Sequence, residues 1–334
     1  MISKGLVLTV LSMINTASTV YPKILVQNFV ILSTILCAFM GWCSGLVDGY
    51  GLLIFGLFTG CSSIYFNPFG LFSGPFFSSL SYNSLSDNNA SHSSTHTSYG
   101  TKAVHGLALL FIFIIFFGVL HHKLPGFHNV PVLLQHSVSP NSMPFNLWFN
   151  FDRNFLAMVL YMYGMTSVAN PYRCLEKQDR KAIEALVIIF VFVTCIGLIT
   201  ALALSVGYIE WDIKWPSITG LWSVNNLFFT CFVEEVWFRW FLQGQIKRYF
   251  AQYSSKRMMR YGPHILASAL LFGVDHAIKG GLIYGVLALV AGLFYGYIYD
   301  RTGRISYTCV FHFLLNALHF VLFTYPASNS MVLK

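Results

Sequence analysis

Long apolar runs separated by short polar segments dominate the chain. Eight runs have the length of a membrane-spanning helix or come close to it, and shorter apolar stretches occur at 6–14 and 155–169. Because a spanning helix needs roughly 20 apolar residues, about eight spans are expected. The runs are 24–46, 50–66, 104–120, 182–208, 220–244, 262–277, 281–299 and 305–324.

These runs are continuously apolar and do not alternate. A backbone that crosses lipid must satisfy its hydrogen bonds within a helix or a closed barrel, and barrel strands alternate apolar with polar positions. The pattern therefore predicts an all-α fold, a polytopic membrane helix bundle with about eight transmembrane helices.

Composition excludes a soluble enzyme. Of the 334 residues, 56% are hydrophobic and only 10% are charged, whereas soluble domains average about 25% charged residues. The formal charge of +8 arises from cations in short clusters between the apolar runs. Nucleic-acid-binding proteins instead gather such cations on one face. We therefore expect a lipid bilayer around the chain and no nucleic-acid partner.

The cations of the second half alternate from loop to loop. The segments 170–181, 245–261 and 300–304 hold four, five and two Lys or Arg residues, and the loops between them hold one each. The positive-inside rule then places the three richer segments in the cytoplasm.

The N-terminal half carries fewer signals. Residues 6–14 predict an uncleaved first helix or interfacial segment rather than a signal peptide. Residues 78–101 are rich in Ser, Asn and His and predict a solvent loop. The seven cysteines are scattered, which argues against a disulfide framework or a zinc knuckle.

Polar side chains inside three of the apolar runs are the candidate chemistry, because such groups are costly in hydrocarbon. In the first run, Glu235 and Arg239 are four residues apart and are expected to pair on one helical face. Glu234 projects about 100° away and has no partner in its own helix. These residues either hold helices together as a neutral network or form a scaffold with Glu234 as the reactive group.

The other two runs each contribute a pair with the same spacing. Phe272 can pack under the imidazole of His276, and Gly273 permits another helix to approach closely. His312 and Asn316 place two hydrogen-bonding side chains on one stripe, which His319 extends. Each pair could either bond neighbouring helices together or take part in the chemistry of a site.

Together these residues form the patterns EExxxR, FxxxH and HxxxN, in that order, within about eighty residues. This set resembles the CPBP family, which comprises CAAX proteases and bacteriocin-processing (Abi) enzymes and is also described as glutamic intramembrane proteases. The segment 292–304 is similar to prokaryotic members. The resemblance covers 182–324.

The resemblance implies catalytic roles for four residues. Glu234 and His276 would position and deprotonate a water molecule, and His312 and Asn316 would stabilise the oxyanion. No metal or other cofactor is implied. A zinc ion held by Glu234 and the two histidines is the alternative.

Supporting roles follow for three further residues: Glu235 and Arg239 would hold the helix and set the local field, and Phe272 would pack against His276.

The distances of the catalytic candidates from the ends of their apolar runs do not agree. Glu234 and His312 lie roughly 10–15 Å from the cytoplasmic ends of their runs at about 1.5 Å per residue, but His276 lies about 20 Å from its own. Either the helix after Gly262 begins outside the bilayer or the helices are offset.

We therefore predict an intramembrane glutamic endopeptidase that cuts a membrane-tethered or membrane-proximal protein or peptide. Residues 1–181 would form a variable N-terminal membrane region and 182–325 the CPBP-like protease core, in a prokaryotic cytoplasmic (inner) membrane. The alternative is a non-proteolytic membrane scaffold or immunity-type protein of the same fold.

Overall fold

Helices make up most of the part of the chain that the computed structural model describes, residues 31–66, 99–166, 181–253 and 262–330. The predicted helical membrane fold is confirmed. Five helices are long and apolar enough to cross a membrane. They are α2 (Gly49–Phe66), α4 (Tyr99–Leu120), α6 (Lys181–Ser205), α11 (Pro263–Thr302) and α12 (Ile305–Leu322). The segment 6–14 and most of the Ser-rich loop 78–101 lie outside the described residues.

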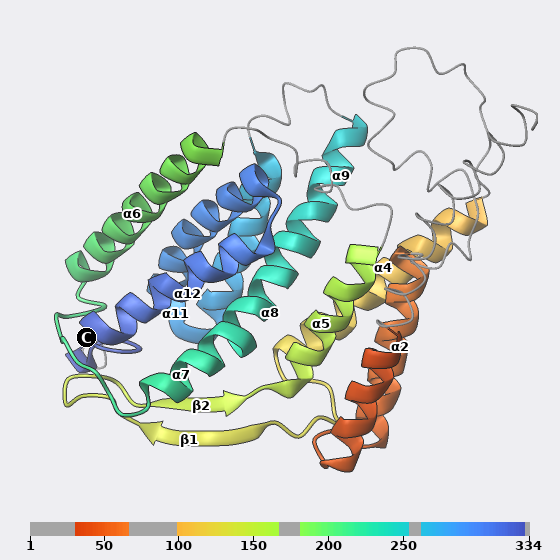
Figure 1. The fold of residues 1–334 in the computed structure, drawn as a ribbon, viewed down its shortest axis with the longest axis horizontal. Helices are drawn as coiled ribbons and strands as arrows, with labels where there is room; N and C mark the ends of the chain where they lie inside the picture. Colours follow the sequence, from red (N-terminus) through yellow and green to blue (C-terminus); the bar gives the residue numbers. More distant parts are fainter. Residues whose placement is uncertain (1–30, 67–98, 167–180, 254–261, 331–334) are drawn as a thin grey trace, which may run out of the picture. The chain divides into compact units, whose positions relative to one another are not determined.

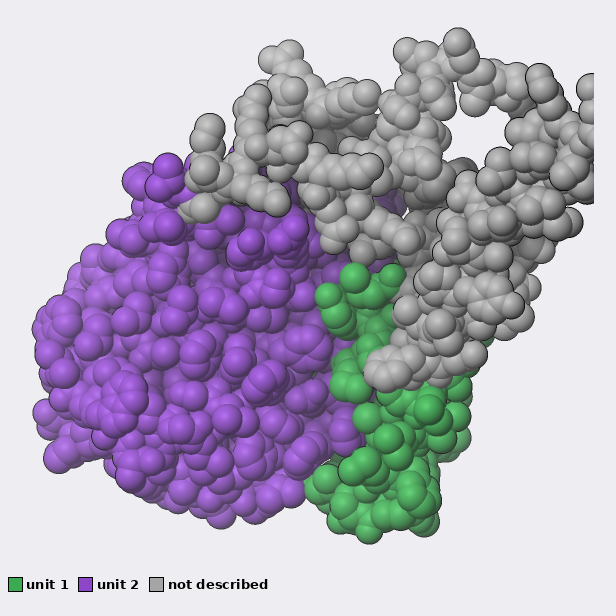
Figure 2. Space-filling view, in the orientation of Figure 1, with its two compact units in different colours: residues 1–128, 158–170 green, residues 129–157, 171–334 purple. Residues whose placement is uncertain are grey.

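The described helices belong to two compact units (Figure 2). One unit comprises residues 1–128 with 158–170, and the other comprises 129–157 with 171–334. The predicted domain boundary after residue 181 stays a prediction.

In the first unit, α2 packs against α4 through the rings of Phe58 and Phe116, whose centroids are 6.2 Å apart. Asp48 caps α2, since its Oδ1 accepts hydrogen bonds from the backbone N–H groups of Tyr50 (2.8 Å) and Gly51 (3.1 Å). The hydrogen bond from Gly51 contributes most to lowering the pKa of Asp48. The cap fixes where this apolar helix begins.

The second unit contains a long helix over 219–253, labelled α7, α8 and α9 along its length (Figure 1). The winding of this helix changes from segment to segment. The backbone keeps right-handed helical angles at the junctions between its segments, for example φ −62° and ψ −44° at Asn226, so the helix is continuous. We refer to residues 219–253 as the rod helix. Its segments are α7 (Thr219–Asn225), the π-helical η2 (Asn226–Cys231), α8 (Phe232–Glu234), the π-helical η3 (Glu235–Gln243) and α9 (Gly244–Tyr253).

Helix α11 is two antiparallel arms joined at a glycine turn. Gly280 (φ −142°, ψ 16°) and Gly281 (φ 86°, ψ 173°) leave the helical region, and the Gly281 conformation suits only glycine. The returning arm lies so close that a Cβ on Gly273 would be 2.9 Å from the carbonyl oxygen of Gly285. The apolar runs 262–277 and 281–299 are therefore separate helices, as the sequence predicts.

A two-stranded antiparallel hairpin, β1 (Val130–His136) and β2 (Phe145–Phe149), was absent from the predicted elements. Its connecting loop is fastened to the segment after α6, because Ser139 Oγ donates to the Asp212 carboxylate at 2.5 Å and Lys214 pairs with the same group at 3.0 Å. Burial raises the pKa of Asp212, but these two contacts outweigh it and the pKa is lowered. The hairpin is thus stabilised by contacts between residues that are far apart in the chain. The local sequence pattern of 130–149 does not reveal such contacts.

The close approach of the α11 arms gives the first prediction. Gly273→Ala should lower stability by about 1–3 kcal/mol, because the added methyl group overpacks against the opposite backbone. Gly197→Ala in α6 is the matched control, since a Cβ there meets no atom within 4 Å. Thermal unfolding in detergent measures both. Equal midpoints for the two variants would contradict the close packing.

Candidate active site

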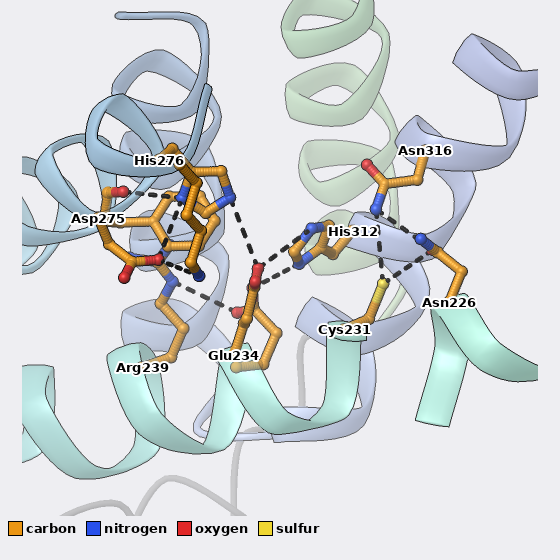
Figure 3. A network of polar contacts seen from close by, with 11 residues as sticks. Asn226, Cys231, Glu234, Arg239, Asp275, His276, His312 and Asn316 are labelled. Carbon is orange, nitrogen blue, oxygen red and sulfur yellow. Dashed lines mark hydrogen bonds and ion pairs between the residues drawn. The ribbon is translucent and has the colours of Figure 1, made fainter. Parts of the chain in front are cut away.

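The three sequence motifs converge in the second unit (Figure 3). Glu234 ends α8, and the η3 residues Glu235 and Arg239 follow it on the rod helix. His276 lies on the first arm of α11 and His312 on α12. All five side chains are buried, with exposed fractions of 6% or less. Residues from three elements, spread over 79 positions, therefore share one interior.

The Glu234 carboxylate faces both imidazoles without a direct hydrogen bond to either. Its Oε2 lies 3.7 Å from His276 Nε2 and 4.0 Å from His312 Nε2. Among the described residues this oxygen has no hydrogen-bond partner. Both separations are longer than a direct hydrogen bond. The carboxylate therefore lies beside both imidazoles without being bonded to either.

The orientation of His276 is fixed from its other side. Its Nδ1 lies 2.9 Å from the Phe272 carbonyl oxygen, which can only accept, so Nδ1 carries the hydrogen. In the neutral ring, Nε2 is then an acceptor that faces another acceptor, Glu234. A donor of two hydrogens, such as water, satisfies both. The Phe272 ring packs on this imidazole at 4.1 Å between centroids, as the spacing predicts.

Glu235 contacts two partners at once. Its Oε2 accepts from Arg239 Nε at 3.3 Å, which is the predicted i,i+4 pair, and its Oε1 lies 2.9 Å from His312 Nδ1. The contact to His312 was not predicted. It leaves His312 Nε2 directed at the Glu234 side, because the other ring nitrogen is held by the carboxylate.

Arg239 is fully enclosed. Its Nη1 donates to Ser268 Oγ at 3.2 Å, and its guanidinium carbon lies 4.7 Å from the centre of the Phe272 ring and 5.6 Å from that of Tyr295. The Tyr295 ring also stacks on His312 at 4.7 Å. Sequence reasoning missed both Ser268 and Tyr295, because neither forms part of a motif and only the folding of α11 brings them here.

Asn316 lies on the adjoining side of the site. Its Nδ2 is 3.2 Å from Asn226 Oδ1 and 3.8 Å from Cys231 Sγ, and both of these residues belong to η2 of the rod helix. Asn226 also accepts from Cys231 Sγ at 3.2 Å. The two rod residues are five positions apart, which in an α-helix would point them to different faces. π-helical hydrogen bonds close on i→i+5 and bring them to one face.

His319 takes no part in this group of contacts around Glu234, whereas Asp275 adjoins it, since its Oδ2 lies 3.7 Å from His276 Nδ1 (Figure 3). His319 Nε2 lies 3.1 Å from the Thr324 carbonyl oxygen, which fastens the end of α12. Asp275 is buried and its carboxylate pairs with Lys279 at 2.6 Å.

Glu234 and His276 lie at similar distances along their helices from one charged cluster, in which Asp300 contacts both helices. Asp300 Oδ1 lies 2.6 Å from Lys247 Nζ and 2.8 Å from His264 Nε2. Glu234 is 13 residues from Lys247 and His276 is 12 residues from His264, about 20 and 18 Å along their helices. The rod helix continues past its apolar run to Tyr253, so the end of that run is not the end of the helix.

The convergence does not create a metal-ligand set. Within the described ranges, no group of three His, Cys, Asp or Glu side chains is placed to hold a metal ion. Glu234, His276 and His312, the ligands of the zinc alternative, share an interior but do not form such a group.

Comparison with known proteins bears on the segment that holds all three motifs. Residues 216–318 match the family described as type II CAAX prenyl endopeptidase Rce1-like. No curated protein and no solved structure matches the chain. The matched segment is just under a third of the sequence, and it spans the rod helix from its N-terminal end, both arms of α11 and most of α12. The resemblance is thereby confirmed over residues 216–318, which are similar to the CAAX protease family, and the long apolar helices indicate an integral membrane protein.

Proposed function

We propose that the protein is a glutamic endopeptidase that hydrolyses a peptide bond in a membrane-tethered or membrane-proximal protein or peptide. One observation carries the proposal. Glu234 Oε2 is buried, has no hydrogen-bond partner among the described residues, and faces the Nε2 atoms of His276 and His312 at 3.7 and 4.0 Å. A carboxylate kept for helix packing would instead be hydrogen-bonded directly.

In the proposed reaction a water molecule lies between Glu234 and His276. Glu234 takes its proton while the hydroxide attacks the carbonyl carbon of the substrate. The same carboxyl group then returns the proton to the leaving amine. One positioned acid–base group contributes typically 10²–10⁴-fold in rate.

The oxyanion formed by this attack needs hydrogen-bond donors. His312 Nε2 would donate to the oxyanion from the doubly protonated ring, whose other N–H, at Nδ1, is donated to Glu235. Asn316 would add a second donor. Such a donor is worth on the order of 10²–10³-fold. Glu235 and Arg239 orient His312 and do not themselves transfer protons.

In the alternative, a non-proteolytic scaffold, the motif residues would satisfy one another's hydrogen-bonding groups directly. Each imidazole is fixed through Nδ1, by a carbonyl or by Glu235. The Nε2 atoms remain turned toward Glu234 at distances too long for direct bonds, and this geometry favours the enzyme. The prokaryotic inner membrane stays a prediction.

Replacement of the proposed acid–base group is the main test. Glu234→Gln should lower cleavage by 10²-fold or more while the protein remains in the membrane. The matched control, Glu210→Gln, changes a carboxylate on the segment after α6, where it bonds Ser328 and Ser330. Comparison of new protein N-termini in membranes carrying the wild type or each variant measures cleavage and identifies substrates. Undiminished cleavage by Glu234→Gln would refute the mechanism.

Metal chelation provides a separate test. EDTA should leave cleavage by the purified protein unchanged, because the proposed water is activated by Glu234 and His276 alone. Loss of activity with EDTA and its recovery on adding zinc would instead support the zinc-dependent version.

The buried ion pair between Glu235 and Arg239 should be needed for folding as well as for activity. Arg239→Ala leaves Glu235 without its cation, and breaking a buried pair costs about 3–5 kcal/mol. The amount of protein in the membrane should therefore fall together with activity. Arg248→Ala is the control, since that side chain contacts Gln245 on its own helix at 3.4 Å. Normal abundance of Arg239→Ala would contradict this role.

A further inference from the structure

Two adjacent asparagines on the rod helix serve different neighbours. Asn225 donates from Nδ2 to the Trp148 carbonyl oxygen of β2 at 2.7 Å. Asn226 contacts Asn316 on α12 and Cys231 on the rod helix itself. Both side chains are 6% exposed. They differ in what they hold: Asn225 fastens the rod helix to the hairpin, whereas Asn226 lies against a proposed oxyanion donor.

The hydrogen bonds of Asn226 define which way the Asn316 amide points. Asn226 Oδ1 is the acceptor for two groups, Cys231 Sγ at 3.2 Å and Asn316 Nδ2 at 3.2 Å. Cys231 can offer this oxygen a hydrogen. With Oδ1 held in that position, the Asn316 side chain must present its NH₂ group, and not its oxygen, to the rod helix that carries Glu234.

We propose that Asn226 is a positioning residue that holds the amide nitrogen of Asn316 toward the reacting carbonyl. One of the two Nδ2 hydrogens is donated to Asn226 at 3.2 Å. Cys231 Sγ, at 3.8 Å, is a weaker acceptor for the same amide, and the oxyanion would replace it. An amide turned the other way would present an oxygen to a developing negative charge. The inference rests on the proposed function, in which Asn316 stabilises the oxyanion.

The π-helical winding of η2 is what makes this arrangement possible. Asn226 and Cys231 reach the same oxygen only because five residues complete a turn there. In α-helical winding the thiol would lie on another face and Asn226 would lose the contact that fixes its orientation.

A double-mutant cycle tests the proposal. The substrate is a fluorogenic peptide copied from a cleavage site mapped in wild-type membranes, and the enzyme is the full chain in detergent. Asn226→Ala should lower kcat about 10- to 100-fold with KM little changed, since a displacement of about 1 Å can cost 10²-fold. Asn226→Leu, which fills the same space without an acceptor, should do the same. In an Asn316→Ala background, either change should have no further effect.

Asn225→Ala is the matched control, because it removes a neighbouring amide of equal burial whose partner is Trp148. The fold-losses of kcat caused by Asn225→Ala and by Asn316→Ala should multiply in the double variant, as expected for independent sites. The inference would be overturned if the fold-losses of kcat from the Asn226 and Asn316 variants multiplied in the double variant, or if kcat were unchanged in both Asn226 variants. Either result would leave the proposed function standing. An unchanged kcat in Asn316→Ala would overturn the oxyanion role itself and the inference with it.

Discussion

A charged guanidinium inside an apolar helix bundle is the constraint on which the site depends. Arg239 has no exposed surface, so its charge must be balanced within the protein. Glu235 supplies the countercharge, Ser268 a hydrogen-bond acceptor, and the rings of Phe272 and Tyr295 their electron-rich faces. These partners come from the rod helix and both arms of α11, and Glu235 extends the network to α12 through His312. A cation that requires all of these elements holds them in one arrangement.

This balance also explains why two adjacent glutamates differ. Glu235 uses both of its oxygens on Arg239 and His312, and it is therefore committed to structure. Glu234 has no cation of its own at hydrogen-bonding distance among the described residues. It faces two imidazole nitrogens at 3.7 and 4.0 Å, beyond the length of a direct hydrogen bond. The two glutamates differ because Arg239 bonds Glu235 and not Glu234. This difference supports the proposal that Glu234 is the acid–base group.

Helix geometry is adjusted locally to bring these groups together. The π-helical segments η2 and η3 flank Glu234, and η2 brings Asn226 and Cys231 to one face. The glycine turn of α11 folds the chain back so that Phe272 and Tyr295, 23 residues apart, both lie against the same guanidinium. Uniform α-helices would satisfy the backbone equally well but would not place these side chains around one carboxylate.

The sequence by itself determined the membrane class, the helical fold, the separate runs on either side of Gly281 and the three motifs, because hydropathy and i,i+4 spacing are local properties. The pairing of Glu235 with Arg239 and the packing of Phe272 on His276 were predictable for the same reason. Only the tertiary structure decided that Glu235 also holds His312, that Asn226 contacts Asn316, and that a hairpin is fastened at Asp212. Those contacts join residues 70 to 90 positions apart or depend on a change of helical winding, and neither leaves a periodic trace in the chain.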